Sequence, residues 1–181
     1  MAIEIEKKYR LDKKRRERVA ARLKELGAVF AGEAFEENFL HKGGELKEKA
    51  AVLRLRKIGG TTILTYKEKF REELDIKHRI EYETKVSDVD ATEKIIQSLG
   101  FILNVIYEKR RQTWHFGEVE VVLDELPFGL YMEIEGTAEA IEKAEKKLGV
   151  GDLEPESRGY PRLTIANGTQ IEGVYESRFE R

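Results

Sequence analysis

The first strand-like segment of the chain places charged residues at every second position. Glu4, Glu6 and Lys8 alternate with Ile3 and Ile5, and a β-strand sends alternate side chains to opposite faces. Two carboxylates and an ammonium group would therefore lie on one face of this strand. Such a face serves either for solvation or for binding a metal and a phosphate, and this segment alone does not distinguish the two.

The same alternation recurs in most later strand-like segments, where the charges are sorted by sign from strand to strand. The basic pairs are Arg54/Arg56 and Lys109/Arg111, and the acidic pairs are Glu4/Glu6, Glu81/Glu83 and Glu133/Glu135. Lys67, Arg79 and Asp124 occupy further alternate positions. The solvated face of an ordinary antiparallel sheet tolerates random signs. The segregation of charge therefore favours a binding surface.

Eight strand-like segments have to position these residues. They are Ile3–Arg10, Phe35–Lys42, Val52–Ile58, Thr61–Lys69, Ile76–Val86, Ile106–His115, Val119–Glu125 and Leu130–Gly136. The Gly59-Gly60 pair between two of them is a strong hairpin signal, because glycine adopts the positive φ angles of a two-residue turn. Short turns between most of the strands indicate an antiparallel α+β domain.

Three amphipathic helices are expected at Lys13–Leu26, Ser87–Leu99 and Thr137–Leu148. Asp12 and either Ser87 or Asp88 are the expected N-caps of the first two helices. The apolar stripe of the second helix consists of Ala91, Ile95, Ile96 and Leu99. The first two helices both end in Leu-Gly and are followed by an apolar segment, which hints at two related halves.

These helices need an apolar sheet surface to cover, and the Leu/Ile/Val/Tyr face of the strands supplies it. If about eight strands curl into a barrel, the charged face becomes its interior and no strand edge stays exposed. Buried charges of both signs require mutual pairing, water or a charged ligand. A basic wall implies a polyanion, and carboxylates beside it imply Mg²⁺ or Mn²⁺. Together they predict a site for a metal-bound polyphosphate.

Composition limits the other functions. The 181 residues suit one domain, and 33 basic residues against 35 acidic ones give a net charge of −2, which disfavours nucleic acid as a partner. The chain has no cysteine, which excludes disulfides and thiolate chemistry. We find no apolar signal core, no run of roughly 18 apolar residues for a membrane span and no Walker A loop. We therefore expect a cytoplasmic protein that does not bind membranes.

The motifs, taken in order, resemble those of the CYTH superfamily, also called triphosphate tunnel metalloenzymes. Its members include class IV adenylyl cyclases, thiamine triphosphatases and inorganic triphosphatases. Glu4-Ile5-Glu6-Lys7-Lys8 matches the Glu-x-Glu-x-Lys signature of the family. The motifs that follow in the family's order are Arg54-Leu55-Arg56, Thr65-Tyr66-Lys67, Arg79-Ile80-Glu81-Tyr82-Glu83, Lys109-Arg110-Arg111, Leu123-Asp124-Glu125 and Glu133-Ile134-Glu135.

The resemblance implies an eight-stranded antiparallel β-barrel tunnel with a charged interior and helices outside. The implied metal ligands are Glu4, Glu6, Asp124, Glu133 and Glu135, and the implied catalytic set is Glu4, Glu6, Lys8 and Glu135. The implied phosphate contacts are Lys8, Arg54, Arg56, Lys67, Arg79, Lys109 and Arg111, while Glu81 and Glu83 either contact ligand or pair within the wall. Either Glu6 or Glu135 would orient the attacking water.

We therefore expect a Mg²⁺- or Mn²⁺-dependent hydrolase of inorganic, thiamine or nucleoside triphosphate. A class IV adenylyl cyclase that forms cyclic AMP and pyrophosphate is the first alternative, and a non-catalytic polyphosphate-binding module is the second. The sequence leaves the oligomeric state open, with a homodimer as one option.

The expected tunnel domain spans residues 1–166, and a polar tail spans residues 167–181. The sequence departs from the family pattern at the end of this domain. Many cyclase-like members carry Ser-Tyr-x-x-Leu where this chain has Gly159-Tyr160-Pro161-Arg162-Leu163. Pro161 should discourage a regular helix through Arg162, because proline lacks the amide donor and clashes with the preceding turn.

Overall fold

The computed structural model describes the backbone of residues 2–73 and 76–180, and the side chains of residues 5–68 and 80–180. The strands of this part are β1 Ala2–Leu11, β2 Val29–Lys42, β3 Val52–Ile58, β4 Thr61–Glu73, β5 Ile76–Val86, β6 Ile102–Phe116, β7 Val119–Leu126, β8 Gly129–Glu135, β9 Thr169–Ile171 and β10 Val174–Ser177. The helices are α1 Lys13–Glu25, α2 Val89–Ser98, α3 Ala138–Leu148 and α4 Tyr160–Asn167.

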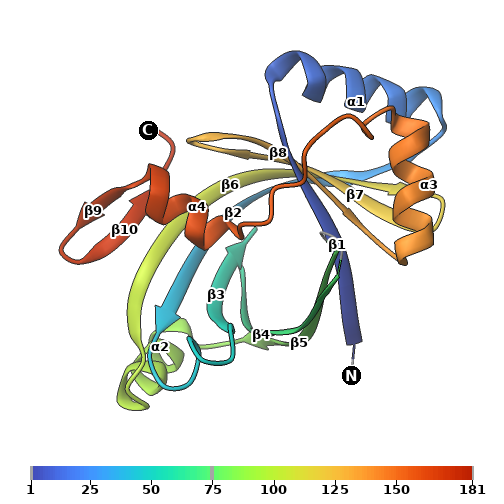
Figure 1. Cartoon of the computed structure of the whole chain (residues 1–181). Helices are drawn as coiled ribbons and strands as arrows, with labels where there is room; N and C mark the ends of the chain where they lie inside the picture. Colours follow the sequence, from blue (N-terminus) through green and yellow to red (C-terminus); the bar gives the residue numbers. More distant parts are fainter. Residues whose placement is uncertain (1, 74–75, 181) are drawn as a thin grey trace.

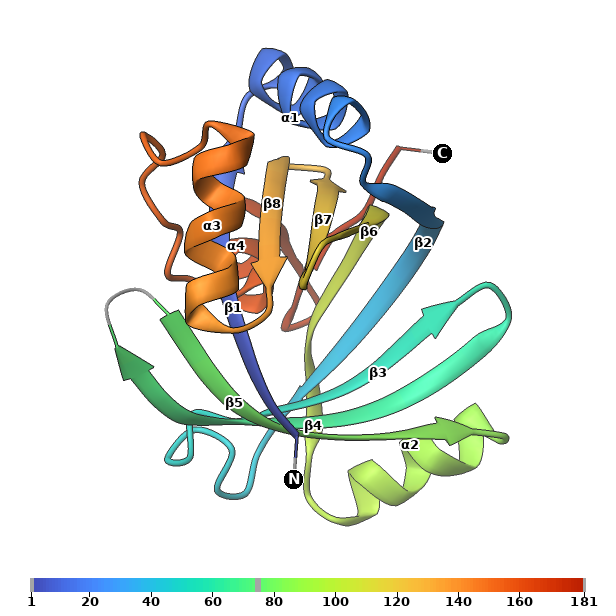
Figure 2. The same cartoon turned by 90° about the vertical axis from the view of Figure 1, so that its right-hand side faces the viewer.

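Strands β1–β8 form a closed antiparallel ring. Their order is β2-β3-β4-β5-β1-β8-β7-β6, and a long β2–β6 ladder joins the two ends. Figure 2 shows α1 and α3 outside this ring at one end of the molecule and α2 outside it at the other. The predicted fold, an eight-stranded barrel with external helices, is confirmed. Among the described residues, no helix has the length and apolar character that a membrane span requires.

The apolar faces of β1, β6, β7 and β8 point outward, under α1 and α3 (Figure 1). Met132 and Ile134 of β8 are fully buried in this layer with Leu23 of α1 and Ile141 of α3, and Ile5 of β1 packs against them. Since alternate strand residues face opposite ways, the charged residues between them point into the barrel. The sequence predicted this orientation for Ile5.

The predicted N-caps are confirmed. The Asp12 side chain accepts a hydrogen bond from the Arg15 amide, and the Asp88 side chain accepts one from the Ala91 amide. A side-chain oxygen at this position satisfies one of the first amides of a helix, which have no partner within it. Each cap therefore fixes the point where the chain leaves its strand and turns onto the outer surface.

Helix α2 differs from the expectation that its apolar stripe would cover the sheet. Only Ile96 of the stripe is buried, whereas Ala91, Ile95 and Leu99 are exposed. Figure 2 shows the reason: α2 lies by itself at the end of the molecule opposite to α1 and α3. Periodicity identified the helix but could not tell which of its apolar residues would find a partner.

The prediction that Pro161 would discourage a helix is wrong. Helix α4 begins at Tyr160, so Pro161 falls in the first turn, where a helix has no use for the missing amide donor. Tyr160 and Leu163 of α4 pack against Tyr107, Tyr131 and other inward-facing residues of the barrel. Helix α4 therefore closes one end of the barrel interior.

The C-terminal segment expected to be a polar tail is built onto β6. Strand β10 pairs with Val105–Tyr107, beyond the part of β6 that pairs with β7, and β9 completes a hairpin. The Phe179 amide donates to the carboxylate of Glu108, a buried outward-facing residue, at 2.9 Å. This hairpin follows α4 directly, and the two lie together in Figure 1.

Strand connectivity supports the two halves suggested by the sequence. The order β1-α1-β2-β3-β4 corresponds to β5-α2-β6-β7-β8, and exchanging the halves preserves every pairing in the ring. Alignment of Leu26-Gly27 with Leu99-Gly100 then matches β2 with β6 residue by residue, while β3 corresponds to β7 by its place in the strand order. Only the second half is followed by a further helix, α3.

Candidate active site

Strand register brings the predicted charged residues together on the inner wall of the barrel. On β1 and β8, Glu6 lies opposite Glu135 and Lys8 lies opposite Glu133. The register also pairs Arg54 with Thr65, Thr65 with Glu83, Lys67 with Glu81, and Arg111 with Asp124. Residues distant in sequence thus form two charged surfaces on the inner wall of the barrel.

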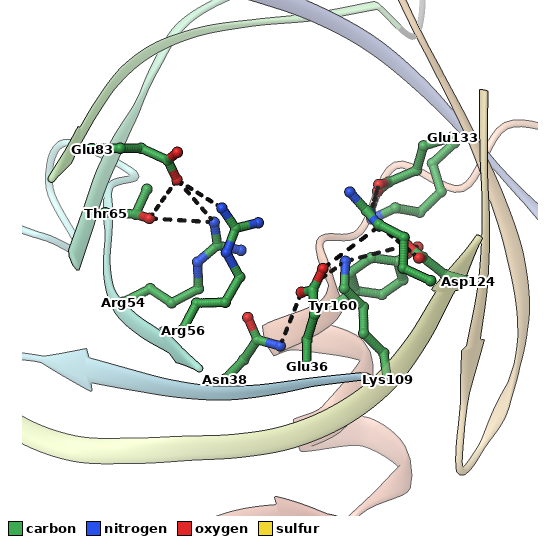
Figure 3. A network of polar contacts seen from close by, with 12 residues as sticks. Glu36, Asn38, Arg54, Arg56, Thr65, Glu83, Lys109, Asp124, Glu133 and Tyr160 are labelled. Atoms are coloured by element: carbon green, nitrogen blue, oxygen red, sulfur yellow. Dashed lines mark hydrogen bonds and ion pairs between the residues drawn. The ribbon is translucent and has the colours of Figure 1, made fainter. Parts of the chain in front are cut away.

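A cavity of about 150 Å³ lies between these surfaces. Figure 3 shows two groups of side chains that face each other, one around Arg54 and Arg56 and the other around Lys109 and Asp124. The residues that line the cavity and were predicted from the sequence are Glu6, Lys8, Arg54, Arg56, Lys67, Glu81, Lys109, Arg111 and Glu133. Tyr160 of α4 also lines it.

Arg111 organises one side of the cavity. Its guanidinium donates to both carboxylate oxygens of Asp124, at 2.7 and 2.6 Å, and to Glu133 at 2.6 Å. Lys109 Nζ lies 3.4 Å from Asp124 Oδ2 and 3.3 Å from Glu36 Oε2. Two cations and three carboxylates hold one another in place, and with Lys8, which lies 3.2 Å from Glu133, the formal charges of this side cancel.

Tyr160 ties α4 to the same group. Its hydroxyl donates to Asp124 Oδ2 at 2.7 Å, and Lys8 Nζ lies 3.9 Å from the centre of its ring. Lys8 also lies 3.2 Å from Glu133 Oε1 and donates to the carbonyl of Arg158 at 3.2 Å. Helix α4 is therefore anchored to the charged wall by a hydrogen bond and by a cation–π contact.

The opposite side of the cavity carries Arg54 and Arg56. Arg56 Nη2 lies 3.0 Å from Glu83 Oε1, the oxygen that also accepts from Thr65 and lies 3.8 Å from Arg54. The exposed carboxylate of Glu83 thus lies near both arginines, and Glu81 Oε1 lies 4.0 Å from Arg54. The Nε atoms of Arg54 and Arg56 are buried without a hydrogen-bond partner, so this side has donors to offer an anion.

The pKa values of Arg111 and Arg56 also differ between the two sides of the cavity. Burial works to lower the pKa of Arg111, but Asp124, Glu133 and Glu36 outweigh it and hold the pKa well above its usual range. For Arg56, burial and the positive charge of Arg54 lower the pKa. Burial is the larger of these two causes, and at the neighbouring Arg54 it is outweighed by Tyr107, Glu36 and Glu81, which raise the pKa of Arg54. A bound anion would favour the charged form of Arg56.

The sequence missed the buried residues Glu36, Asn38, Tyr107 and Tyr160. Glu36 is 2% exposed and lies among Lys109, Arg111, Arg56 and Arg54. Burial acts to raise its pKa, but these cations outweigh burial and lower the pKa to about 2. Glu36 and Glu37 are adjacent, so alternation could not choose between them without the register of β2. Only Asn38 and Leu40, which follow at alternate positions and also point inward, could have indicated that register.

Other predicted residues lie at the edge of this site or outside the described side chains. Glu83 and Glu135 are exposed, and Glu135 is held next to Glu6 by the strand register. Glu4 and Arg79 lie opposite each other on the backbones of β1 and β5, but their side chains fall outside the part of the structure described here.

Residues 2–160 match the family model of the CYTH domain. The chain belongs to the CYTH family. The predicted family is thereby confirmed, over a segment that contains every strand of the ring. Two solved structures from Pyrococcus horikoshii OT3 are similar to this CYTH protein. The PH1012 protein is 25% identical with a TM-score of 0.77, over 88% of this chain and 98% of that one.

The second archaeal relative, the PH1819 protein, is 26% identical with a TM-score of 0.73, over 90% of this chain and 98% of that one. HpAC1 from Hippeastrum, a candidate adenylyl cyclase with a dominant triphosphatase activity, is 16% identical with a TM-score of 0.70. This likeness spans 97% of this chain and 100% of HpAC1 and concerns the fold. No match is found among curated proteins.

CYTH proteins depend on divalent metal, and the donors of this chain suit such an ion. Glu6, Glu133 and Glu135 offer carboxylate oxygens from neighbouring strands, and hard oxygen ligands are those that Mg²⁺ and Mn²⁺ prefer. Within the described side chains, no three acidic or histidine groups converge closely enough to form a metal site. Of the other predicted ligands, Asp124 accepts hydrogen bonds from Arg111 and Tyr160, and the side chain of Glu4 falls outside the described part.

Proposed function

We propose that this CYTH protein hydrolyses the terminal phosphoanhydride bond of a triphosphate bound inside the barrel. The observation that carries the proposal is the cavity of about 150 Å³ between a basic group at Arg54 and Arg56 and the carboxylates of β1 and β8. Helix α4 closes one end, and charged groups make up most of the lining. Both features favour a compact polyanion such as inorganic triphosphate.

The residue types fit phosphoryl transfer, which depends on positioning and charge neutralisation more than on covalent help from the protein. Arg54 and Arg56 would hold phosphate oxygens through planar, paired contacts, and Lys8, Lys67 and Lys109 would supply point charges. Arg111 would act from a fixed position, because Asp124 and Glu133 hold its guanidinium.

The carboxylates of β1 and β8 would complete the reaction. Glu4, Glu6, Glu133 and Glu135 would hold the divalent ion, which when bound neutralises phosphate charge and activates water. Glu6 or Glu135 would orient the water for in-line attack on the terminal phosphorus. The products would be orthophosphate and the remaining diphosphate, with one water consumed.

The test is orthophosphate release from tripolyphosphate, thiamine triphosphate and ATP in the presence of Mg²⁺ or Mn²⁺. Arg56→Gln and Lys57→Gln form a matched pair, because neighbouring residues of β3 face the cavity and the solvent. We expect Arg56→Gln to lower kcat/KM by roughly 100-fold or more, the usual effect of removing one charged donor from a phosphoryl site. Lys57→Gln should leave it unchanged, and equal losses in both variants would refute the proposed site.

The same incubation distinguishes the alternatives. Cyclic AMP and pyrophosphate formed from ATP would identify an adenylyl cyclase. Tight binding of tripolyphosphate without turnover, unchanged in Glu4→Gln and Glu6→Gln, would identify a binding module and contradict both enzyme functions.

A further inference from the structure

Helix α2 carries an apolar ridge that faces solvent. Ala91, Ile95 and Leu99 are spaced by four residues and so line one side of the helix, and Ile102 follows at the start of β6. Ile95, Leu99 and Ile102 are 60%, 70% and 55% exposed. In a chain whose residues are 38% charged, adjoining aliphatic side chains this exposed mark an interaction surface. These four residues are called the α2 ridge below.

The exposure of the α2 ridge follows from a well-anchored helix. Ile96 on the other side of α2 is 4% exposed. His41 of β2 is fully buried, and its Nε2 lies 2.9 Å from both carboxylate oxygens of Glu93. The Asp88 cap fixes the first turn. The ridge is therefore held toward solvent by the fold itself.

The first half of the molecule shows what covers the equivalent surface. With Leu26-Gly27 aligned to Leu99-Gly100, Ile95 corresponds to Arg22 and Leu99 corresponds to Leu26. Arg22 Nε donates to the Lys147 carbonyl of α3 at 3.2 Å, and Leu26 packs against the cluster that contains α3. A second helix thus lies beside α1 on this side. Helix α2 has no such neighbour. The reason is that β8 is followed by α3, whereas β4, its equivalent in the first half, is followed directly by β5.

A groove beside the ridge makes this face complementary to itself. A cavity of about 510 Å³ is lined by Gly43, Gly44, Leu46 and Ile102, and its charged lining residues are Lys42, Lys47 and Glu48, two basic against one acidic. A Cβ at Gly43 would lie 2.8 Å from the Gly100 carbonyl oxygen, so glycine is needed for this close approach. The groove presents lysines at the C-terminal end of α2, and the ridge presents Asp88 at its N-terminal end.

We propose that the α2 ridge binds a second copy of this chain in a two-fold symmetric dimer, with the two α2 helices antiparallel. In a two-fold interface the same patch meets itself, so each ridge can enter the partner's groove at the same time. The antiparallel arrangement also places each Asp88 toward the partner's lysines, which favours this register. The dimer is independent of the chemistry inside the barrel.

Sedimentation velocity of the full chain over a range of micromolar concentrations tests the dimer. We expect wild type to be dimeric and Leu99→Glu to weaken dimerisation by roughly 100-fold, because the substitution buries an unpaired charge in the interface. Ile171→Glu is the matched control, since Ile171 on β9 is 52% exposed but lies outside the ridge, and it should leave the dimer intact. Circular dichroism establishes that each variant is folded.

A second variant tests the geometry. Because the chain has no cysteine, Ile95→Cys introduces a single thiol near the expected two-fold axis, where it would meet its own copy. Mild oxidation should join two Ile95→Cys chains through a disulfide and leave Ile171→Cys monomeric on a non-reducing gel. A monomeric wild type, or a dimer that neither Leu99→Glu nor oxidation of Ile95→Cys affects, would overturn the proposal.

Discussion

Glu36 provides a quantitative test of the electrostatics inside the barrel. Burial acts to raise its pKa, but Lys109, Arg111, Arg56 and Arg54 outweigh burial and lower it from 4.5 to about 2. At about 1.36 kcal/mol for each pKa unit, this difference of about 2.5 corresponds to about 3 kcal/mol of folding free energy. That contribution depends on the ionised carboxylate, so Glu36→Gln removes its dependence on pH.

The direction in which stability changes with pH follows from the lowered pKa of Glu36. A carboxylate whose pKa is lower in the folded state stabilises the fold at pH values above its unfolded pKa, and this contribution disappears as the pH falls through its folded pKa. The unfolding free energy of wild type relative to Glu36→Gln should therefore be constant above about pH 5. Between about pH 4.5 and pH 2 it should fall by about 3 kcal/mol.

Urea unfolding followed by far-ultraviolet circular dichroism at a series of pH values measures this difference. The slopes of the transitions should agree between the two proteins, since both expose the same surface on unfolding. Glu33→Gln is the control, because Glu33 lies on the same strand but is exposed, and its difference from wild type should stay small throughout. A difference between wild type and Glu36→Gln that does not change between pH 5 and pH 2 would refute the reasoning.

Three further substitutions have defined expectations, each measured by urea unfolding at neutral pH. Leu23→Ala removes a fully buried side chain between α1 and the sheet and should cost about 3 kcal/mol, and a loss under about 1 kcal/mol would contradict this packing. Tyr160→Phe removes the hydrogen bond to the buried Asp124 and should cost about 1–3 kcal/mol, whereas no loss would mean that this bond does not anchor α4. Asp12→Ala removes the cap that accepts from the Arg15 amide and should cost about 1 kcal/mol, and Asp12→Asn should restore much of it.

The strands could be predicted from sequence because their environment has two distinct faces. Ile5 packs under α1 and α3, while Glu6 and Lys8 line the cavity, so burial on one face and charge on the other imposed a period of two. Segregation of charge by strand then indicated a concave wall. The sign of each wall was readable because Arg54 and Arg56 share one strand, and carboxylates occupy the strands opposite.

The features that the sequence did not reveal depend on contacts between distant elements. Pro161 argues against a helix only when it falls inside one, and the start of α4 at Tyr160 is set by packing against Tyr107 and Tyr131. The burial of Ile96 but not of Ile95 depends on where α2 meets β2. Local pattern specifies the type of an element, and tertiary contact specifies which face is used.

The two halves of the barrel carry different charges at equivalent positions. The alignment of the halves matches Asn38 of β2 with Arg111 of β6, and the strand register pairs Asn38 with Arg56 as it pairs Arg111 with Asp124. In the second half the pair is an arginine with a carboxylate, and it is neutral. In the first half the same two positions hold an amide and an arginine, and Arg56 pairs instead with Glu83 of β5. The duplicated scaffold therefore produces a neutral wall that holds α4 and, facing it, the pair Arg54 and Arg56 to which the proposed function assigns the phosphate.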